Sequence, residues 1–231
     1  MKEKLNIAVL FGGCSPEYDV SLQSAAAVIG HMDRERFNPV PIGITRQGDW
    51  YCFGGSIGEI ADDTWHLGTA CSPVTVSLER AKPVLYQCAG NHITEIHVDA
   101  AFPVLHGKNG EDGTVQGMFQ LMGVPVVGCG TLASALCMDK HRAHQVARAV
   151  GVAVPRGCRL ARSFQMDEAQ VHAAAMRYPL FVKPVRAGSS FGVTKVAGPQ
   201  ELADALELAF RYDGEVVMEE AVPCFEVGCA V

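Results

Sequence analysis

The sequence predicts an α/β protein in which an N-terminal domain with an open parallel sheet is followed by a central α+β domain. Three observations favour this fold class. The apolar run at residues 7–11 lacks polar alternation and stops at two glycines before a helical pattern, as buried parallel strands do. From there to residue 219, runs typical of strands and of helices alternate. The length of 231 residues suits two packed units better than one.

The first domain is expected to span residues 1–128. Short strand-like runs between Gly and Asn turns fill its middle, and a glycine-rich loop precedes its last helix. The expected elements are strand 7–11, helix 21–31, strand 40–44, edge strands or hairpins at 74–78, 84–88 and 92–98, helix 114–122 and strand 125–127.

The second domain is expected to span residues 129–224, with a hairpin loop at its centre. Its expected elements are helices 131–137 and 140–150, strand 156–160, helix 167–177, strands 180–183 and 192–196, helix 199–210 and strand 216–219. Residues 225–231 are expected to form the first strand of a third domain that the chain does not complete.

Composition excludes several classes of function. The formal net charge is −6 and the 19 Lys and Arg are scattered, which argues against nucleic acid as a partner. The apolar run after the charged N-terminal residues is too short for a signal peptide or a membrane span. The nine cysteines form no Cys-x-x-Cys pair, which favours a reducing compartment. We therefore expect a cytoplasmic protein without a membrane partner.

The segment His106–Gly113 combines three glycines with a histidine, a lysine and two adjacent acids. It directly follows the apolar run at 101–105, so it lies where a buried strand ends, and open α/β sheets bind ligands at that edge. The alternative is an ordinary turn, because glycine and acidic residues are common in turns.

The segment Gly12–Ser21 joins the first strand to the first helix, and the N–H groups at a helix N-terminus suit an anion. It contains neither a dinucleotide fingerprint nor a P-loop pattern, so phosphate is a weak hypothesis here. Glu17 would hold a ligand ammonium while the helix end favours the ligand carboxylate, as an amino acid requires. The alternative is that Ser15, Asp19 and Ser21 cap the helix.

A lysine at a strand end, Lys183, precedes the adjacent serines Ser189 and Ser190, which lie between glycines. This pattern resembles a flexible cover whose N–H and hydroxyl groups bind nucleotide phosphates. An ordinary hairpin turn is the alternative. Lys140 is a second candidate phosphate lysine, although a lysine at a helix end is usually solvated.

Strand 216–219 ends at two adjacent acids, Glu219 and Glu220, and Glu226 follows. An adenine site often uses the backbone of such a connecting segment, with one acid on the amine and another on the ribose; a solvated strand end is the alternative. His141 and His144 have the spacing of a shared metal site, but the sequence nearby offers no third ligand.

Taken in order, five motifs resemble those of the D-alanine:D-alanine ligase family of the ATP-grasp superfamily. They are Gly12-Gly13-x-Ser15-x-Glu17-x-x-Val20-Ser21, His106-Gly107-x-x-Gly110-Glu111-Asp112-Gly113-x-x-Gln116-Gly117, Met138-Asp139-Lys140, Lys183-Pro184 and Gly188-Ser189-Ser190-x-Gly192. Residues 17–21, 41–46 and 184–188 look most like the vancomycin-resistance branch, notably the D-alanine:D-serine ligases.

The resemblance implies an ATP-dependent ligase that joins D-alanine to D-serine or D-alanine through an acyl phosphate and supplies peptidoglycan precursor, as a homodimer. It also implies the residue roles. Glu17 would hold the ammonium of the first D-alanine, with Ser21 and His106 beside it. Lys140 and Lys183 would bind ATP phosphates, and Ser189 and Ser190 would close over the reacting end. Glu219 and Glu226 would hold adenine and ribose, and the backbone of Glu220 and Val222 would read the adenine edge.

In this family the Mg²⁺ ligands and the arginine that stabilises the transferring charge lie in the last third of the protein, so the metal ligands are expected beyond Val231. We therefore expect the 231-residue polypeptide to be inactive by itself, and ATP-dependent phosphate release with D-alanine would contradict this. Two alternatives remain: another ATP-grasp carboxylate–amine ligase with a different acceptor, and a non-catalytic module that binds a nucleotide or an amino acid.

Overall fold

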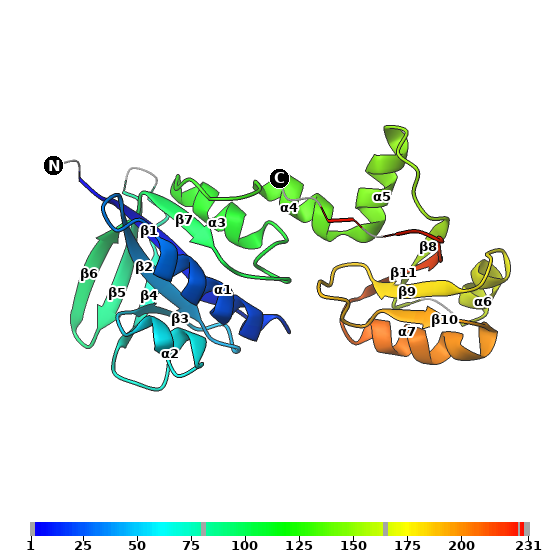
Figure 1. Ribbon diagram of the computed structural model, residues 1–231, viewed down its shortest axis with the longest axis horizontal. Helices are drawn as coiled ribbons and strands as arrows, with labels where there is room; N and C mark the ends of the chain where they lie inside the picture. Colours follow the sequence, from blue (N-terminus) through cyan, green and yellow to red (C-terminus); the bar gives the residue numbers. More distant parts are fainter. Residues whose placement is uncertain (1–2, 80–81, 164–165, 226, 229–231) are drawn as a thin grey trace. The chain divides into compact units, whose positions relative to one another are not determined.

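The computed structural model describes residues 3–79, 82–163, 166–225 and 227–228. The chain divides into two compact units, Met1–Leu136 and Cys137–Val231, which are described separately (Figure 1). The expected domain boundary at residue 128 and the expected third domain stay predictions. In the described part of the chain, no helix has both the length and the apolar character needed to cross a membrane.

Unit 1 is an α/β layer built on a seven-stranded sheet with the strand order β6-β5-β4-β3-β2-β1-β7. The strands β2, β1 and β7 are parallel, whereas β3 to β6 continue the sheet as an antiparallel meander. The elements are β1 Leu5–Gly12, α1 Tyr18–His31, β2 Phe37–Ile44, β3 Trp50–Phe53, α2 Ile57–Ala61, β4 Cys71–Val76, β5 Val84–Ala89, β6 His92–His97, β7 Ala100–Pro103, α3 Thr114–Met122 and most of α4 Thr131–Met138, whose last two residues belong to unit 2. The predicted α/β class is confirmed, with a sheet that is mixed rather than wholly parallel.

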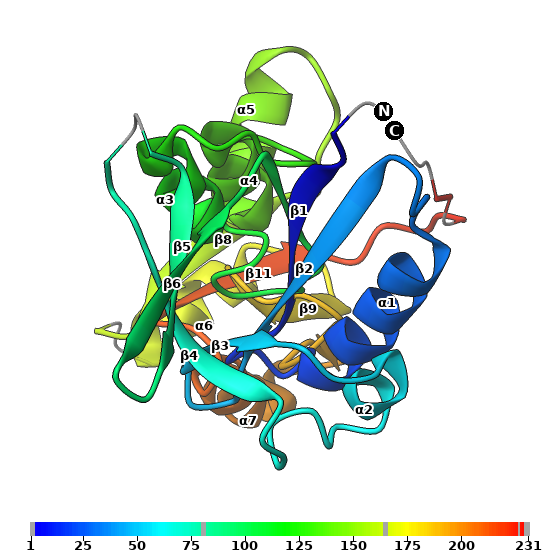
Figure 2. The ribbon, with the colours of Figure 1, turned by 90° about the vertical axis from the view of Figure 1, so that its left-hand side faces the viewer.

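The apolar run in β1 is buried on both faces because helices cover both sides of the sheet (Figure 2). Val9 and Phe11 pack in the cluster that includes α1 and α2, whereas Ala8 and Leu10 pack in the cluster that includes α3. The alternation of side chains along a strand therefore supplies two cores from one element.

The path of the chain creates a switch point beside β1. From β1 the chain passes through α1 to β2 on one side, crosses the meander, and returns as β7 on the other side of β1. The loops that follow β1 and β7 therefore leave the carboxyl edge of the sheet side by side. Open α/β sheets bind ligands at this place.

Some local expectations for unit 1 were wrong. The predicted strand at 125–127 is only an isolated bridge between Ala101 and Val126. Helix α1 begins at Tyr18, three residues before the predicted start at Ser21, and no side chain caps it, so capping by Ser15, Asp19 and Ser21 is also wrong. Two short elements, β3 and α2, were not predicted, because four or five residues show no clear period.

Unit 2 is an α+β layer with an antiparallel sheet of the order β10-β9-β11-β8. Its elements are α5 Lys140–Ala149, β8 Gly157–Ala161, α6 Met166–Ala174, β9 Leu180–Pro184, β10 Thr194–Val196, the 3₁₀ turn η1 Pro199–Glu201, α7 Leu202–Phe210 and β11 Glu215–Glu220. These match the expected order. The helix expected over 167–177 ends at Ala174, and the one expected over 199–210 begins with the 3₁₀ turn.

The two faces of the unit 2 sheet differ in character. Val216 and Met218 of β11 lie in a core cluster with residues of α6 and α7. The alternate residues of β11 point to the opposite face, where the register aligns Arg159, Val217 and Lys183 in one row across three strands. This charged row lies between Glu215 and Glu219, so the sheet presents a polar face opposite its core.

Replacing two glycines of unit 1 with alanine should change the stability in opposite directions. A Cβ on the buried Gly43 of β2 would lie 2.3 Å from the ring of Trp65, whereas a Cβ on Gly30, an exposed residue of α1, meets no atom within 4 Å. We expect Gly43→Ala to lower the free energy of unfolding by about 2 kcal/mol through overpacking. Gly30→Ala should raise it by about 0.5–1 kcal/mol by restricting the unfolded chain. Both tryptophans lie in unit 1, so urea denaturation followed by tryptophan fluorescence measures this difference, and equal effects would contradict it.

Candidate active site

Two buried serines join the loops at the switch point of unit 1. The Ser21 hydroxyl accepts a hydrogen bond from the Gly12 N–H at 2.9 Å and donates one to the Val104 carbonyl. The Ser15 hydroxyl donates to the His106 carbonyl at 2.7 Å. Ser21 is fully buried, so its hydroxyl ties the end of β1 to the end of β7 and is not open to a ligand.

Glu17 lies directly against the loop that follows β7. Its side chain is 5% exposed, and a Cβ on Gly107 would lie 2.1 Å from Oε2 of Glu17. Gly107 has a φ of +69°, so this position favours glycine for both its backbone conformation and the close approach. The half-buried His106 precedes it, with Nε2 3.3 Å from the Ser24 hydroxyl. The structure thus brings Glu17, Ser21 and His106 together at one edge of the sheet.

The two acids of the glycine-rich loop hold its backbone. Glu111 accepts a hydrogen bond from the Gly107 N–H at 2.7 Å. Asp112 accepts from the N–H groups of Asn109 and Thr114 at 2.8 and 3.1 Å. Both carboxylates therefore shape the loop. Among the described residues, no group of three or more His, Cys, Asp or Glu could hold a metal ion.

A cavity of about 240 Å³ lies beside this loop, next to the switch point. Its lining comes from the ends of β1 and β2, the loop after β7 and the start of α3. The lining residues include Gly13, Cys14, Trp50, His106 and Lys108. Pockets for drug-sized ligands have volumes of about 300–1,000 Å³, so this cavity is smaller than such a pocket. It suits a ligand the size of a small amino acid.

In unit 2, the two predicted phosphate lysines lie on neighbouring elements of the polar face. Lys183 of β9 donates to Glu219 of β11, which is 6% exposed and also lies 3.8 Å from Nδ1 of His144. Lys140, the first residue of α5, donates to the Ala187 carbonyl in the serine loop. The backbone N–H of Lys140 donates to the Val185 carbonyl at 3.1 Å, which fixes the start of α5 beside the end of β9.

Burial lowers the pKa of Lys140, and the charge of Lys183 lowers it further. Nearby acids, Asp213 first among them, act in the opposite direction. The two lysines repel each other, and an anion that contacts both would offset this repulsion.

The serine loop, residues 185–193, joins β9 to β10 in a constrained conformation. Ser189 and Ser190 have φ values of +47° and +59°, a region that costs residues other than glycine about 1 kcal/mol or more each. Both serines are exposed. Successive residues in such conformations form the concave N–H arrangements that bind anions.

The segment after β11 contains the residues predicted to bind adenine. The Glu220 carboxylate accepts hydrogen bonds from the backbone N–H and from the guanidinium of Arg177, each at 3.1 Å, and both lower the pKa of this carboxyl group. The Glu220 N–H donates to the Arg156 carbonyl at 2.8 Å. Val222 is exposed, and within the described residues its N–H has no hydrogen-bond partner. Glu226 lies outside the described residues.

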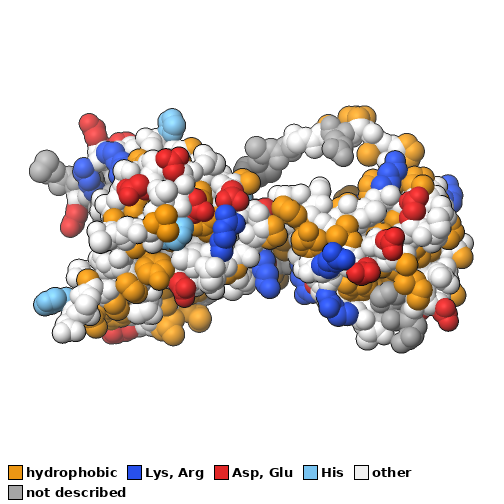
Figure 3. All heavy atoms as spheres, turned by 90° about the horizontal axis from the view of Figure 1, so that it is seen from below, with side chains coloured by type: hydrophobic (Ala, Val, Ile, Leu, Met, Phe, Trp, Pro, Cys, Tyr) orange, Lys and Arg blue, Asp and Glu red, His pale blue; other side chains and the backbone are white. Residues whose placement is uncertain are grey.

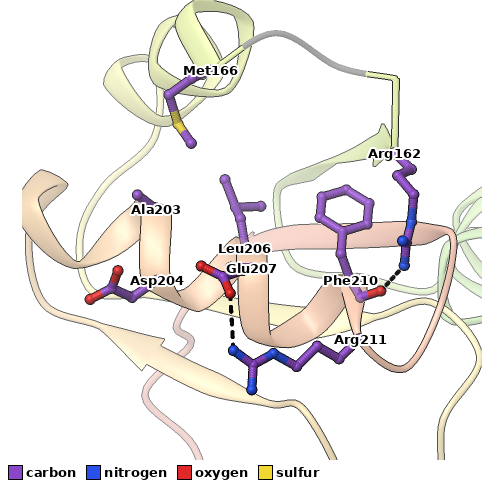
Figure 4. Close-up of a pocket in the computed structure, with 8 residues that line it drawn as sticks. All are labelled: Arg162, Met166, Ala203, Asp204, Leu206, Glu207, Phe210 and Arg211. Carbon is purple, nitrogen blue, oxygen red and sulfur yellow. Dashed lines mark hydrogen bonds and ion pairs between the residues drawn. The ribbon is translucent and has the colours of Figure 1, made fainter.

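A groove in unit 2 lies over α7, and its lining includes none of the predicted site residues (Figure 4). It has a volume of about 630 Å³, and Met166, Leu206 and Phe210 give it an apolar floor. Its cations are engaged locally, since Arg211 pairs with Glu207 at 2.9 Å and Arg162 donates to the Phe210 carbonyl. Basic and acidic side chains are also interspersed on the face shown in Figure 3, without a basic stripe.

Two features of the site were not foreseen from the sequence. The resemblance implies that His106 lies beside Glu17, but not the close approach of Gly107 to Glu17, which is 90 positions earlier in the chain. Asp213 follows α7 in a short turn, where an acid indicates nothing beyond solvation, yet its side chain is 7% exposed and holds Arg186.

An open α/β unit with a cavity beside its switch point, followed by an α+β unit with two lysines and a serine-glycine hairpin, agrees with the ATP-grasp class of protein. Residues 6–129 match the model described as the D-ala D-ala ligase N-terminus, and residues 146–231 match the D-ala D-ala ligase C-terminus. The chain belongs to the D-alanine–D-alanine ligase family.

Known relatives agree with this assignment. The chain is 43% identical to the vancomycin B-type resistance protein VanB of Enterococcus faecalis and 41% identical to a D-alanine–D-alanine ligase of Caldicellulosiruptor bescii, with 99% of this chain and 63% of each relative covered. The crystal structure of the VanG D-Ala:D-Ser ligase from Enterococcus faecalis superposes with a TM-score of 0.88 at 49% identity, covering 96% of this chain and 64% of that chain. The chain thus spans about 63% of the length of the curated relatives it matches.

Proposed function

We propose that the protein is an ATP-dependent ligase that joins D-alanine to a second D-amino acid in the supply of peptidoglycan precursor. The observation that carries this proposal is the arrangement of Glu17, Gly107 and His106 at the switch point of unit 1. A carboxylate at 5% exposure against a glycine, with a histidine beside it, provides a site for the ammonium of a small amino acid. An ATP-grasp ligase with a different first substrate would not need this arrangement.

In the proposed reaction, a carboxylate oxygen of D-alanine attacks the γ-phosphorus of ATP, and the bond to the β-phosphate oxygen breaks. The products are an acyl phosphate and ADP. The amine of the second amino acid then attacks the acyl carbon, phosphate leaves, and the amine loses a proton. Phosphoryl transfer of this kind depends mainly on positioning and charge stabilisation, so Lys140 and Lys183 would offset the phosphate charge. Ser189 and Ser190 would bind the reacting end and exclude water.

For the nucleotide base, we propose the segment after β11. The exposed Val222 N–H would donate to the adenine edge, while Glu219 and the backbone of Glu220 contact the exocyclic amine. Glu226 is proposed for the ribose. Mg²⁺ would accompany the ATP phosphates. A homodimer and a cytoplasmic location also stay proposals, which rest on the family and on composition.

We further propose D-serine as the second substrate, since the VanG D-Ala:D-Ser ligase is 49% identical over 96% of the chain. Other relatives are named for D-alanine or, in Streptomyces coelicolor, as a putative D-alanine–D-lactate ligase, so all three acceptors must be compared.

A ligase assay tests the proposed function. The chain is joined to the unmatched remainder of the VanG ligase, and ADP release is measured with D-alanine alone and with D-serine or D-lactate added. We expect ADP release that requires D-alanine and is highest with D-serine. ADP release with no dependence on D-alanine would indicate another ATP-grasp ligase, whereas ATP binding without turnover would indicate a non-catalytic module. Glu17→Gln should abolish the ADP release that requires D-alanine, and Glu35→Gln, an exposed acid elsewhere in unit 1, is the control.

The pH dependence of ATP binding follows from the lowered pKa of Lys140. Only the charged lysine attracts phosphate, so ATP affinity should fall as the pH rises, beginning below the ordinary lysine pKa of about 10.4. In Lys140→Arg, the fall should move to higher pH because arginine stays protonated. Calorimetric titrations from about pH 7 to 10 measure both profiles, and superimposable profiles would exclude Lys140 from the phosphate site.

A further inference from the structure

The serine loop is attached to the turn between α7 and β11 at both of its ends. At the start of the loop, Arg186 makes three hydrogen bonds to Asp213: its backbone N–H donates at 2.7 Å, Nε at 3.0 Å and Nη2 at 2.8 Å. The guanidinium and the carboxylate thus form a forked pair, the geometry that gives Arg–carboxylate contacts their directional strength.

At the end of the loop, the attachment is made by Tyr212, the residue before Asp213 in the chain. Its ring lies 6.0 Å from the ring of Phe191, and a Cβ on Gly192 would lie 2.6 Å from Cδ2 of Tyr212. The residues between these two attachments include Ser189 and Ser190. The segment that carries both serines is therefore attached at each end to one turn, Tyr212–Asp213.

Asp213 can anchor the serine loop because its own side chain is held in place. Its side chain is 7% exposed, and Oδ1 also accepts from the Glu215 N–H at 3.3 Å at the start of β11. Arg186 also lies 3.3 Å from Glu215. A largely buried carboxylate that is bonded to a strand of the sheet gives the loop a rigid reference, whereas the serines themselves have strained φ values and are exposed.

The same attachment reaches the lysine site. Ala187, the residue after Arg186, accepts a hydrogen bond from Nζ of Lys140. A shift of Arg186 would therefore move the carbonyl that orients Lys140, together with the two serine hydroxyls.

We propose that Asp213 is a positioning residue for phosphate binding: by holding Arg186, it sets the serine loop and Lys140 in the arrangement that contacts the β- and γ-phosphates. This inference rests on the proposed function, because it takes the phosphates of ATP as the ligand of the loop. Asp213 touches no reacting atom in this assignment. Its effect is transmitted through the backbone and guanidinium of Arg186.

The test compares Asp213→Asn with Asp204→Asn, an exposed acid on α7, in the full 231-residue chain. Hydrogen exchange without nucleotide is the first measurement. In Asp213→Asn, the amides of Arg186, Phe191 and Val193 should exchange at least about tenfold faster, while the β11 amides from Val216 to Glu220 are unchanged. Faster exchange throughout unit 2 would show a general structural role and overturn the inference, as would unchanged exchange in the loop.

Nucleotide affinity is the second measurement, because it separates positioning from folding. Asp213→Asn should weaken ATP binding about tenfold and leave AMP binding unchanged, since AMP lacks the β- and γ-phosphates. Asp213→Glu should recover part of the affinity, and Asp204→Asn should match the wild type. Equal losses for ATP and AMP would overturn the inference. If the wild type binds no ATP, the proposed function fails, and the exchange measurement still decides whether Asp213 holds the loop.

Discussion

Replacing Lys183 with methionine is expected to weaken ATP binding about one hundredfold. The lysine lies on the polar face of the unit 2 sheet, in the same row as Arg159, and its charge adds to burial in lowering the pKa of Lys140. Loss of a charge-assisted contact to phosphate commonly amounts to about 2–3 kcal/mol, which corresponds to that change in affinity. Lys195→Met is the control, because Lys195 is an exposed lysine on the adjoining strand β10.

The same substitution removes the lysine that pairs with Glu219, whose side chain is only 6% exposed. A buried charge without its partner is unfavourable, so unit 2 should also lose about 2 kcal/mol of stability. The double variant Lys183→Met/Glu219→Gln separates the two effects when it is compared with Glu219→Gln alone, because Glu219 is itself proposed to contact adenine. Removing the acid as well should restore the melting temperature measured by circular dichroism without restoring ATP affinity measured by calorimetry. If the double variant recovered both, the loss in Lys183→Met would be one of folding, and Lys183 would not contact phosphate.

Ser21→Ala is expected to lower the free energy of unfolding of unit 1 by about 3 kcal/mol. The hydroxyl of Ser21 is the partner of two buried backbone groups, the Gly12 N–H and the Val104 carbonyl. Each buried polar group left without a partner costs about 1–3 kcal/mol. The variant should also bind D-alanine more weakly, because the loops after β1 and β7 lose the link that holds them together.

Ser24→Ala, one helical turn further along α1, is the matched control. The Ser24 hydroxyl is only partly buried and contacts His106 at 3.3 Å, so its loss should cost less than about 1 kcal/mol. Urea denaturation followed by tryptophan fluorescence compares the two variants in unit 1. Similar losses in both would contradict the role assigned to Ser21.

The sequence predicts most of the fold because the relevant signals are local. The apolar run of β1 is long enough to show burial on both faces, and α3 was predicted with its observed ends, where Gly113 and Gly123 both have positive φ values. The strand expected at 125–127 is reduced to one bridge. Ala101 donates to the Pro125 carbonyl and accepts from the Val127 N–H, but Pro125 and Val127 are exposed, so burial does not extend the pairing.

The site could be predicted only where a motif records it. Glu17, His106 and the serine loop follow from motifs, but their partners come from distant parts of the chain. The Ser21 hydroxyl bonds to a carbonyl 83 residues away, and Arg186 bonds to an aspartate 27 residues away. Neither pairing leaves a periodicity or a spacing to find, since hydrogen bonds between loops depend on how the sheet brings the loops together.

We propose that the chain contains two half-sites, one for D-alanine in unit 1 and one for ATP in unit 2. A titration of the 231-residue chain followed by ¹H–¹⁵N NMR tests it most directly. D-alanine, but not L-alanine, should shift amides in residues 12–24 and 105–113. ATP should shift Lys140 and residues 183–193 and 219–222. Equal shifts with the two alanine enantiomers, or ATP shifts that fall in unit 1 and spare the serine loop, would contradict the account.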